Sequence, residues 1–182
     1  MLQTRPQFFR RSEGFTILET LIAIVVLTIA ATGIAGVFAV SIGTNKAQGE
    51  IATRTIEYAE DKMEQLQSIA YLDAATNTTV WPTTLIGGTG LGGAMAGGAT
   101  VGGVTQGAPV AGYVDYLDSV GNVCNGTVCP NGNPVFYQRQ WMIQTNAAGN
   151  LKTITVVAWD LTRIGTRGQA PSTTLVSSKS QI

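Results

Sequence analysis

The sequence predicts an α+β fold, in which a long N-terminal helix with a membrane-spanning first half packs on a small antiparallel β-sheet. Three observations indicate this fold. No residue from Thr20 to Asn45 is charged. Apolar residues then recur at three- and four-residue spacing to about Leu72, as in a helix with one buried face. Two segments rich in β-branched residues follow, separated by a polar turn.

The charge-free segment predicts a membrane-spanning helix. It would rise roughly 39 Å at 1.5 Å per residue, which exceeds the bilayer hydrocarbon core of about 30 Å. A buried core helix is the alternative, but such helices rarely run this long without a polar face. Arg5, Arg10 and Arg11 precede the segment, with Glu13 as the only acid. The positive-inside rule therefore keeps the N-terminus cytoplasmic and places the rest outside the cytoplasm.

Glu19 stands just inside the apolar segment. A charge at the centre of a membrane helix costs about 2.5–3.5 kcal/mol, and less near the interface, so such a residue is a functional-site hypothesis. The alternative is a carboxylate that is stabilised by the dipole at a helix N-terminus. An ordinary signal peptide cleaved after Ala39 would need an apolar region of only about 7–15 residues. The longer segment and Glu19 both argue against that cleavage.

The stretch Gly-Phe-Thr-Ile-Leu-Glu at residues 14–19 resembles a known signal. With its basic leader and charge-free helix, it is similar to the class III signal of type IV prepilins and type II secretion pseudopilins. The usual order in that family is Gly, Phe, Thr, Leu, Ile, Glu, so Ile17 and Leu18 are exchanged here. The resemblance covers about the first 45 residues.

The resemblance implies that prepilin peptidase removes residues 1–14 by cleaving between Gly14 and Phe15, and then methylates the amino group of Phe15. Glu19 would contact the N-terminus of a neighbouring subunit during assembly. The implied partners are other pilin or pseudopilin subunits, an inner-membrane assembly platform, and membrane lipid before assembly. The implied location is the bacterial inner membrane, with the N-terminus cytoplasmic, and then a periplasmic or extracellular filament.

Elementary chemistry agrees with these roles. Gly14 has no side chain, so a protease can approach its backbone closely. A buried carboxylate needs a paired cation, and the cation available near Glu19 after cleavage would be the new amino terminus. Phe15 and Glu19 are one helical turn apart, about 6 Å of rise. A neighbouring subunit shifted by that distance could therefore present its terminus to Glu19.

Residues 15–44 are predicted to form the transmembrane and assembly part of one long helix, and residues 45–72 are predicted to form the amphipathic half of the same helix. Glycines between 33 and 49 weaken the middle of the helix by about 1 kcal/mol each relative to alanine, and either local bending or close helix packing explains them. The predicted buried face contains Ala52, Ile56, Ala59, Met63, Leu66 and Ala70. The charged side chains assigned to the rest of the surface are Glu50, Arg54, Glu57, Glu60, Asp61, Lys62 and Glu64.

Residues 73–112 are predicted to be a glycine-rich variable loop, and residues 113–182 the sheet. Strands are expected at 113–117, 134–145, 151–160 and 172–179, with a hairpin turn at 146–150. Alternation places Val135, Tyr137, Trp141 and Ile143 on the face toward the helix. The hairpin ending in Val-Ala-Trp-Asp also resembles minor pilins of the PilV type.

Cys124 and Cys129 are expected to form a disulfide, because the predicted compartment is oxidising. A loop this short would contribute about 2 kcal/mol. Free thiols are the alternative, and two cysteines in a chain without histidine are too few for zinc. Asp115, Asp118 and Asp160 are interpreted as turn or strand-end residues, with calcium binding by some of them as an alternative.

The composition argues against catalysis and nucleic-acid binding. The chain has no histidine, which excludes histidine-dependent catalysis. Loss of residues 1–14 would leave 8 basic and 10 acidic residues, without a basic stripe for nucleic acid. We therefore predict a protein without enzyme activity, cofactor or metal. The resemblance implies that it is a structural subunit, most simply a minor pilin of a type IV pilus. The alternatives are a pseudopilin of type II secretion or DNA uptake, and a single-pass membrane protein with a periplasmic binding or sensor head.

Overall fold

The structure, a computed structural model, describes residues 14, 16–80, 82–94, 96–126, 128–162 and 171–181. The chain forms two compact units, Met1–Lys46 and Ala47–Ile182. One helix, α1 (Ile17–Ser68), contributes its first part to the first unit and its last part to the second. The second unit is called the head.

The part of α1 that belongs to the first unit is apolar, and the hydroxyls of its threonines bond within the helix. Thr20 donates to Ile17 O at 2.8 Å, and Thr28 donates to Ile24 O at 2.8 Å. Thr32 does the same with two carbonyls of the preceding turn. Because each hydroxyl bonds within the helix, these threonines do not require a polar partner from outside.

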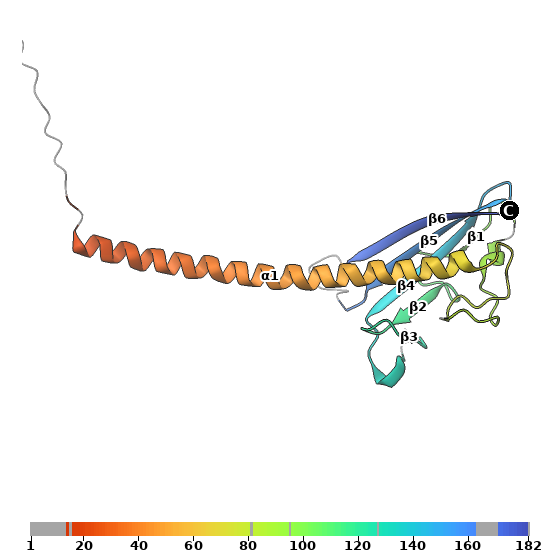
Figure 1. Cartoon of the computed structure of the whole chain (residues 1–182), viewed down its shortest axis with the longest axis horizontal. Coiled ribbons are helices and arrows are strands. Elements are labelled where there is room, and N and C mark those ends of the chain that lie inside the picture. The colour runs from red at the N-terminus through yellow and green to blue at the C-terminus, as the bar shows by residue number, and fades with distance from the viewer. Residues whose placement is uncertain are drawn as a thin grey trace, which may run out of the picture. The chain divides into compact units, whose positions relative to one another are not determined.

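The head contains an antiparallel sheet with strand order β3-β2-β4-β5-β6, with β1 also paired to β4 (Figure 1). Both β2 and β1 pair with β4, β2 along Tyr137–Gln140 and β1 along Met142–Gln144. Two short 3₁₀ helices, η1 and η2, complete the head. The elements are β1 (Thr100–Gly102), β2 (Val114–Leu117), β3 (Val123–Cys124), β4 (Tyr137–Thr145), β5 (Leu151–Asp160), β6 (Ser172–Ser180), η1 (Leu91–Ala94) and η2 (Pro130–Gly132).

Strands β4 and β5 form the hairpin that the sequence predicts, with Trp141 opposite Val156. The side chain of Asn146 holds the turn, because its Oδ1 accepts from the backbone N–H groups of Asn150 and Leu151 at 3.0 and 3.1 Å. Gly149 has φ = 77°, a conformation that glycine adopts without steric cost.

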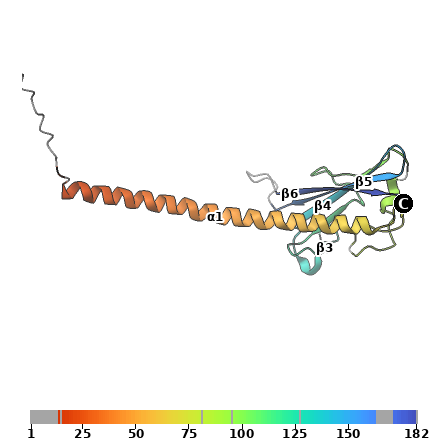
Figure 2. The ribbon, with the colours of Figure 1, turned by 45° about the horizontal axis from the view of Figure 1, so that its top comes forward.

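The last part of α1 lies across one face of this sheet, as Figures 1 and 2 both show. Buried side chains from the helix meet buried side chains from the two central strands, and Trp141 is fully buried between them. This arrangement confirms the predicted α+β fold. The core consists of Ala59, Met63, Leu66, Ile69, Leu91, Ala94, Trp141, Ile143, Ile154, Val156 and Ala158.

The buried face of the helix is rotated from the predicted one. Ile56 is 43% exposed and Ala70 is exposed, although both were expected to be buried. Lys62, expected on the charged surface, is fully buried together with Thr55 and Gln65. The difference arises because Thr55, Lys62 and the amide nitrogen of Gln65 find hydrogen-bond partners in the rest of the head. Spacing along the helix cannot reveal these partners.

The helix ends at Ser68, four residues before the predicted Leu72. Lys179 of β6 donates to the carbonyls of Gln67 and Ile69. The Gln67 carbonyl would otherwise accept a helical hydrogen bond from the N–H of Tyr71. The ammonium of Lys179 thus supplies the hydrogen bonds that backbone N–H groups of a further helical turn would otherwise donate.

The glycine-rich segment is part of the folded head and not a loop throughout. Leu91 and Ala94 of η1 are fully buried, and β1 pairs with β4. Gly102 in β1 has φ = 78°, and a Cβ there would lie 2.3 Å from the Trp141 carbonyl oxygen. Only glycine fits this close approach.

Strand β4 begins at Tyr137, three residues after the predicted start at residue 134. Val135, which was expected on the face toward the helix, therefore precedes the strand.

Candidate functional site at the start of the helix

Thr16 caps the N-terminus of α1. Its Oγ1 accepts from the backbone N–H of Glu19 at 3.2 Å. Its carbonyl oxygen accepts from the N–H groups of Glu19 and Thr20 at 3.0 and 3.2 Å. Thr16 and Glu19 therefore have the spacing of a capping box, in which threonine precedes the helix and an acid occupies its third position. This capping role was not predicted, although Thr-x-x-Glu is a recognisable sequence signal for a helix N-terminus.

Glu19 and Gly14 are exposed at this end of the chain, while Phe15 lies outside the described residues. Glu19 occupies the first turn of α1, where the helix dipole favours a negative charge. None of the ion pairs in the described part of the chain includes Glu19. Cleavage between Gly14 and Phe15, methylation of Phe15 and the contact made by Glu19 all stay predictions.

The first part of α1, on both sides of Glu19, presents an apolar surface. Its large hydrophobic side chains up to Ile42 are 49–87% exposed. The helix is long and apolar enough to cross a membrane, by length and composition. An apolar surface of this extent requires lipid or protein to cover it. Its large side chains are Ile17, Leu18, Leu21, Ile22, Ile24, Val25, Val26, Leu27, Ile29, Ile34, Val37, Phe38, Val40 and Ile42.

A buried cluster of charges joins α1 to the sheet within the head. Asp115 Oδ2 accepts from Lys62 Nζ at 2.6 Å and from Arg139 Nε at 2.9 Å. Arg139 Nη1 also bonds to Asp61 Oδ2 at 3.1 Å and to the Tyr58 carbonyl oxygen at 3.2 Å. Asp115 is thus a buried ion-pair partner in the middle of β2, and its interpretation as a turn or strand-end residue was wrong.

Lys62 is the most perturbed cation of this cluster. Burial lowers its pKa to about 8, and Arg139 also lowers the pKa, whereas Asp115 raises it. The Nζ atom lies 4.1 Å from the centre of the Trp141 ring and donates to the Thr78 carbonyl. Every polar contact of this ammonium is to another part of the head. Because the cluster joins helix, connection and sheet, we interpret it as structural.

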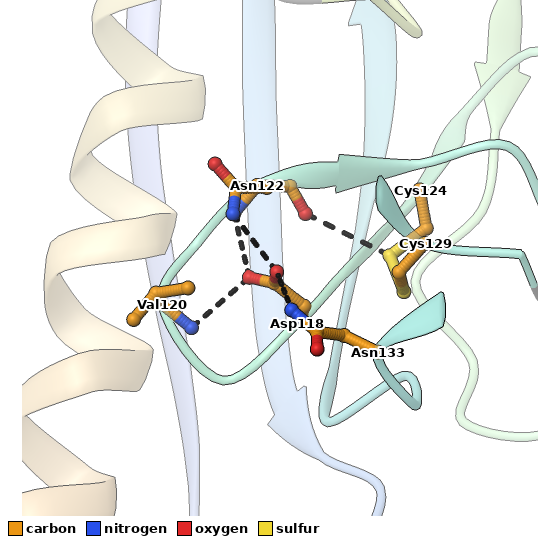
Figure 3. Close-up of a disulfide and its surroundings, with 6 residues drawn as sticks. All are labelled: Asp118, Val120, Asn122, Cys124, Cys129 and Asn133. Atoms are coloured by element: carbon orange, nitrogen blue, oxygen red, sulfur yellow. Dashed lines mark hydrogen bonds between the residues drawn. A yellow bond between two sulfur atoms is a disulfide. The ribbon is translucent and has the colours of Figure 1, made fainter. Parts of the chain in front are cut away.

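The disulfide between Cys124 and Cys129 lies beside a second buried acid, Asp118 (Figure 3). Asp118 accepts from the backbone N–H groups of Val120 and Asn122 at 3.0 and 2.9 Å. It also accepts from the side-chain amides of Asn122 and Asn133 at 2.8 and 3.0 Å. Burial alone would raise the pKa of Asp118, but these hydrogen bonds outweigh it and lower the pKa to about 2.

Asp118 therefore organises the turn after β2, in agreement with the interpretation of this residue as a turn residue. Asp160 ends β5, and its Oδ1 accepts from the N–H and hydroxyl of Thr162 at 2.8 and 2.7 Å. The described residues contain no group of three or more acidic or cysteine side chains that could hold a metal ion.

Lysines secure the connection between helix and sheet. Lys152 donates to the carbonyls of Tyr71 and Leu91, both at 2.6 Å, and burial lowers its pKa. Lys179 and Lys62 make similar bonds to backbone carbonyls of residues 67–78. Three of the four lysines in the sequence are thereby used to hold the segment that follows the helix.

The comparisons with known proteins identify the N-terminal region. Residues 9–35 match the family model of the prokaryotic N-terminal methylation motif. No curated protein and no solved structure shows a significant match to the chain. The matched segment includes Gly14, Thr16 and Glu19 and the first turns of α1. The chain therefore carries the N-terminal methylation motif, the class III signal peptide of type IV pilins.

Proposed function

We propose that this protein is a structural filament subunit, most simply a minor pilin of a type IV pilus. The observation that carries the proposal is the methylation motif at residues 9–35, followed directly by an exposed apolar helix. The motif supports a processed pilin- or pseudopilin-like subunit in general, which is a structural type of protein. The assignment to a pilus and to a minor subunit rests on the resemblance of the hairpin.

In this proposal, prepilin peptidase cleaves between Gly14 and Phe15 and methylates the new amino group. The apolar helix holds the processed chain in the inner membrane until an assembly platform moves it into the filament. There, Glu19 pairs with the amino terminus of a neighbouring subunit. The physical reason is that a carboxylate buried among apolar helices is stable only beside a cation.

Mass spectrometry of the mature N-terminus tests the processing step. We expect a chain that starts with N-methylated Phe15. An intact Met1 would contradict the proposal, and so would a start just after Ala39, since that start indicates an ordinary signal peptide. Replacement of Gly14 by a bulkier residue should leave the leader attached, because the side chain obstructs the protease.

Replacement of Glu19 tests the assembly step separately. Glu19→Ala should be cleaved normally but should enter filaments poorly, as measured by immunoblotting of sheared filaments. Glu60→Ala is a matched control, because Glu60 is an exposed glutamate on the same helix. Equal incorporation of both variants would remove Glu19 from the proposed role.

Deletion of the gene separates the two kinds of filament. Loss of surface pili on gene deletion supports a pilus, whereas loss of protein secretion with intact pili supports the pseudopilin alternative.

A further inference from the structure

Two Asn-Gly dipeptides lie close to the disulfide, at residues 125–126 and 131–132. The sequence contains no other Asn-Gly dipeptide. Asn-Gly is chemically reactive in any protein, because the glycine nitrogen carries no neighbouring Cβ that would shield it. This nitrogen can attack the side-chain amide carbon of the preceding asparagine. The two sites differ in how the fold holds that nitrogen, and this difference decides which of them can react.

Asn125 and Gly126 are both exposed. The backbone of Asn125 pairs with Val128, through N–H to O contacts of 2.8 and 3.2 Å, which closes a tight turn inside the disulfide loop. Gly126 lies at the tip with φ = 62°, and a Cβ there would meet nothing within 4 Å. Among the described residues, neither the N–H of Gly126 nor the side chain of Asn125 has a hydrogen-bond partner.

Gly132 is held differently. It is the last residue of η2, and its N–H donates to the Cys129 carbonyl at 3.3 Å. The neighbouring N–H of Asn133 donates to the Pro130 carbonyl at 3.3 Å. The nitrogen of Gly132 can therefore attack only after this turn opens, whereas the nitrogen of Gly126 needs no opening step.

We propose that Asn125 is a site of spontaneous deamidation in the folded protein and that Asn131 is protected. The nitrogen of Gly126 forms a bond to Cγ of Asn125, the Cγ–Nδ2 bond breaks, and ammonia leaves with the proton that the glycine nitrogen loses. Water then opens the resulting succinimide to aspartate or isoaspartate. The reaction needs no oxidant, cofactor or enzyme, and it is independent of the filament proposal.

The modification would change a defined part of the head. Asn125 and Gly126 line a cavity of about 590 Å³, together with Tyr116 of β2 and Val123 of β3. The described lining of this cavity contains no cation, and its one acid, Asp115, is neutralised by Lys62 and Arg139. Deamidation therefore places an unpaired negative charge at the cavity wall. Formation of isoaspartate would also add one atom to the main chain of the disulfide loop.

The test is a time course on the full-length protein in detergent at mildly alkaline pH, followed by peptide mass spectrometry that locates each aspartate and isoaspartate. We expect modification of Asn125 to exceed that of Asn131 roughly fivefold or more, the factor that one amide hydrogen bond supplies. Asn131 is thus an internal control in every sample. In the denatured and reduced chain, we expect the two sites to react at similar rates.

Equal rates at the two sites in the folded protein would overturn the proposal, and so would faster reaction at Asn131. If both sites react when denatured but neither reacts when folded, the disulfide loop protects Asn125 and the proposal is wrong. The variant Asn125→Gln should remove the signal at residue 125 while leaving the slow reaction at residue 131 unchanged. This variant keeps Gly126 and both cysteines, so the turn and the loop closure are retained.

Discussion

Replacement of Asp115 by alanine should destabilise the head strongly, because this carboxylate neutralises two buried cations. Its Oδ2 lies 2.6 Å from Lys62 Nζ and 2.9 Å from Arg139 Nε. At an effective dielectric constant of about 20, each contact has a Coulomb energy of about 6 kcal/mol. Desolvation of the ions offsets much of this attraction, so the expected loss is about 3–5 kcal/mol, as for other broken buried pairs.

The assay is urea unfolding of the detergent-solubilised chain, followed by tryptophan fluorescence, since Trp141 lies against Lys62. Glu60→Ala is the matched control, because removal of an exposed carboxylate from the same helix should change stability by less than about 0.5 kcal/mol. Asp115→Asn, which keeps the shape of the side chain but lacks the charge, should fall between the two. If Asp115→Ala lost no more than the control, the buried cations would not depend on Asp115, and the structural interpretation of the cluster would be refuted.

Three further outcomes are expected. The folded pKa of Lys62, about 8, lies below its ordinary value of 10.5, so the unfolded chain binds more protons than the folded chain between these two pH values. Between pH 8 and 10.5, the free energy of unfolding of the wild type should therefore rise by about 3 kcal/mol relative to that of Lys62→Met. Urea unfolding at a series of pH values measures this difference. The pKa of Asp118 is lowered from 3.8 to about 2, so its ionised carboxylate should contribute about 2 kcal/mol to the free energy of unfolding above pH 4. This contribution is lost as the pH falls toward 2. Asp118→Asn should not show this loss when unfolding is followed in an acid titration. Amine-reactive labelling of the folded chain should modify the exposed Lys46 well before the buried Lys62 and Lys152 and before the half-buried Lys179. Equal labelling of all four lysines would contradict the hydrogen bonds from the last three to backbone carbonyls.

The hairpin could be predicted from the sequence because its signals are local. Residues 151–160 are rich in β-branched side chains, and β5 has those bounds. The turn before it contains Asn146 and Gly149, residue types that favour turns. Alternation also placed Trp141 and Ile143 correctly on the buried face. Each of these predictions depends on residues that lie within a few positions of one another.

The burial of Lys62 could not be predicted in the same way. Its partner Asp115 lies on β2, far along the chain, and both residue types are almost always exposed unless they are paired. The strand β1 was missed for a related reason, because its three residues lie in a glycine-rich segment and gain strand character only by pairing with β4. At the candidate site, the motif from Gly14 to Glu19 was recognised as a unit, while the capping role of Thr16 within it was not.

The internal bonding of Thr20, Thr28 and Thr32 has a consequence for how the apolar helix can change its surroundings. Each hydroxyl carries its acceptor with it, so these side chains need not exchange partners when lipid tails are replaced by other helices. The transfer between the two media is then close to neutral for most of the helix. Glu19 behaves differently, because its charge makes a dry environment favourable only where a cation is present. We therefore expect the apolar part of the helix to tolerate either medium, and we expect Glu19 to select the positions in which a cation lies beside it.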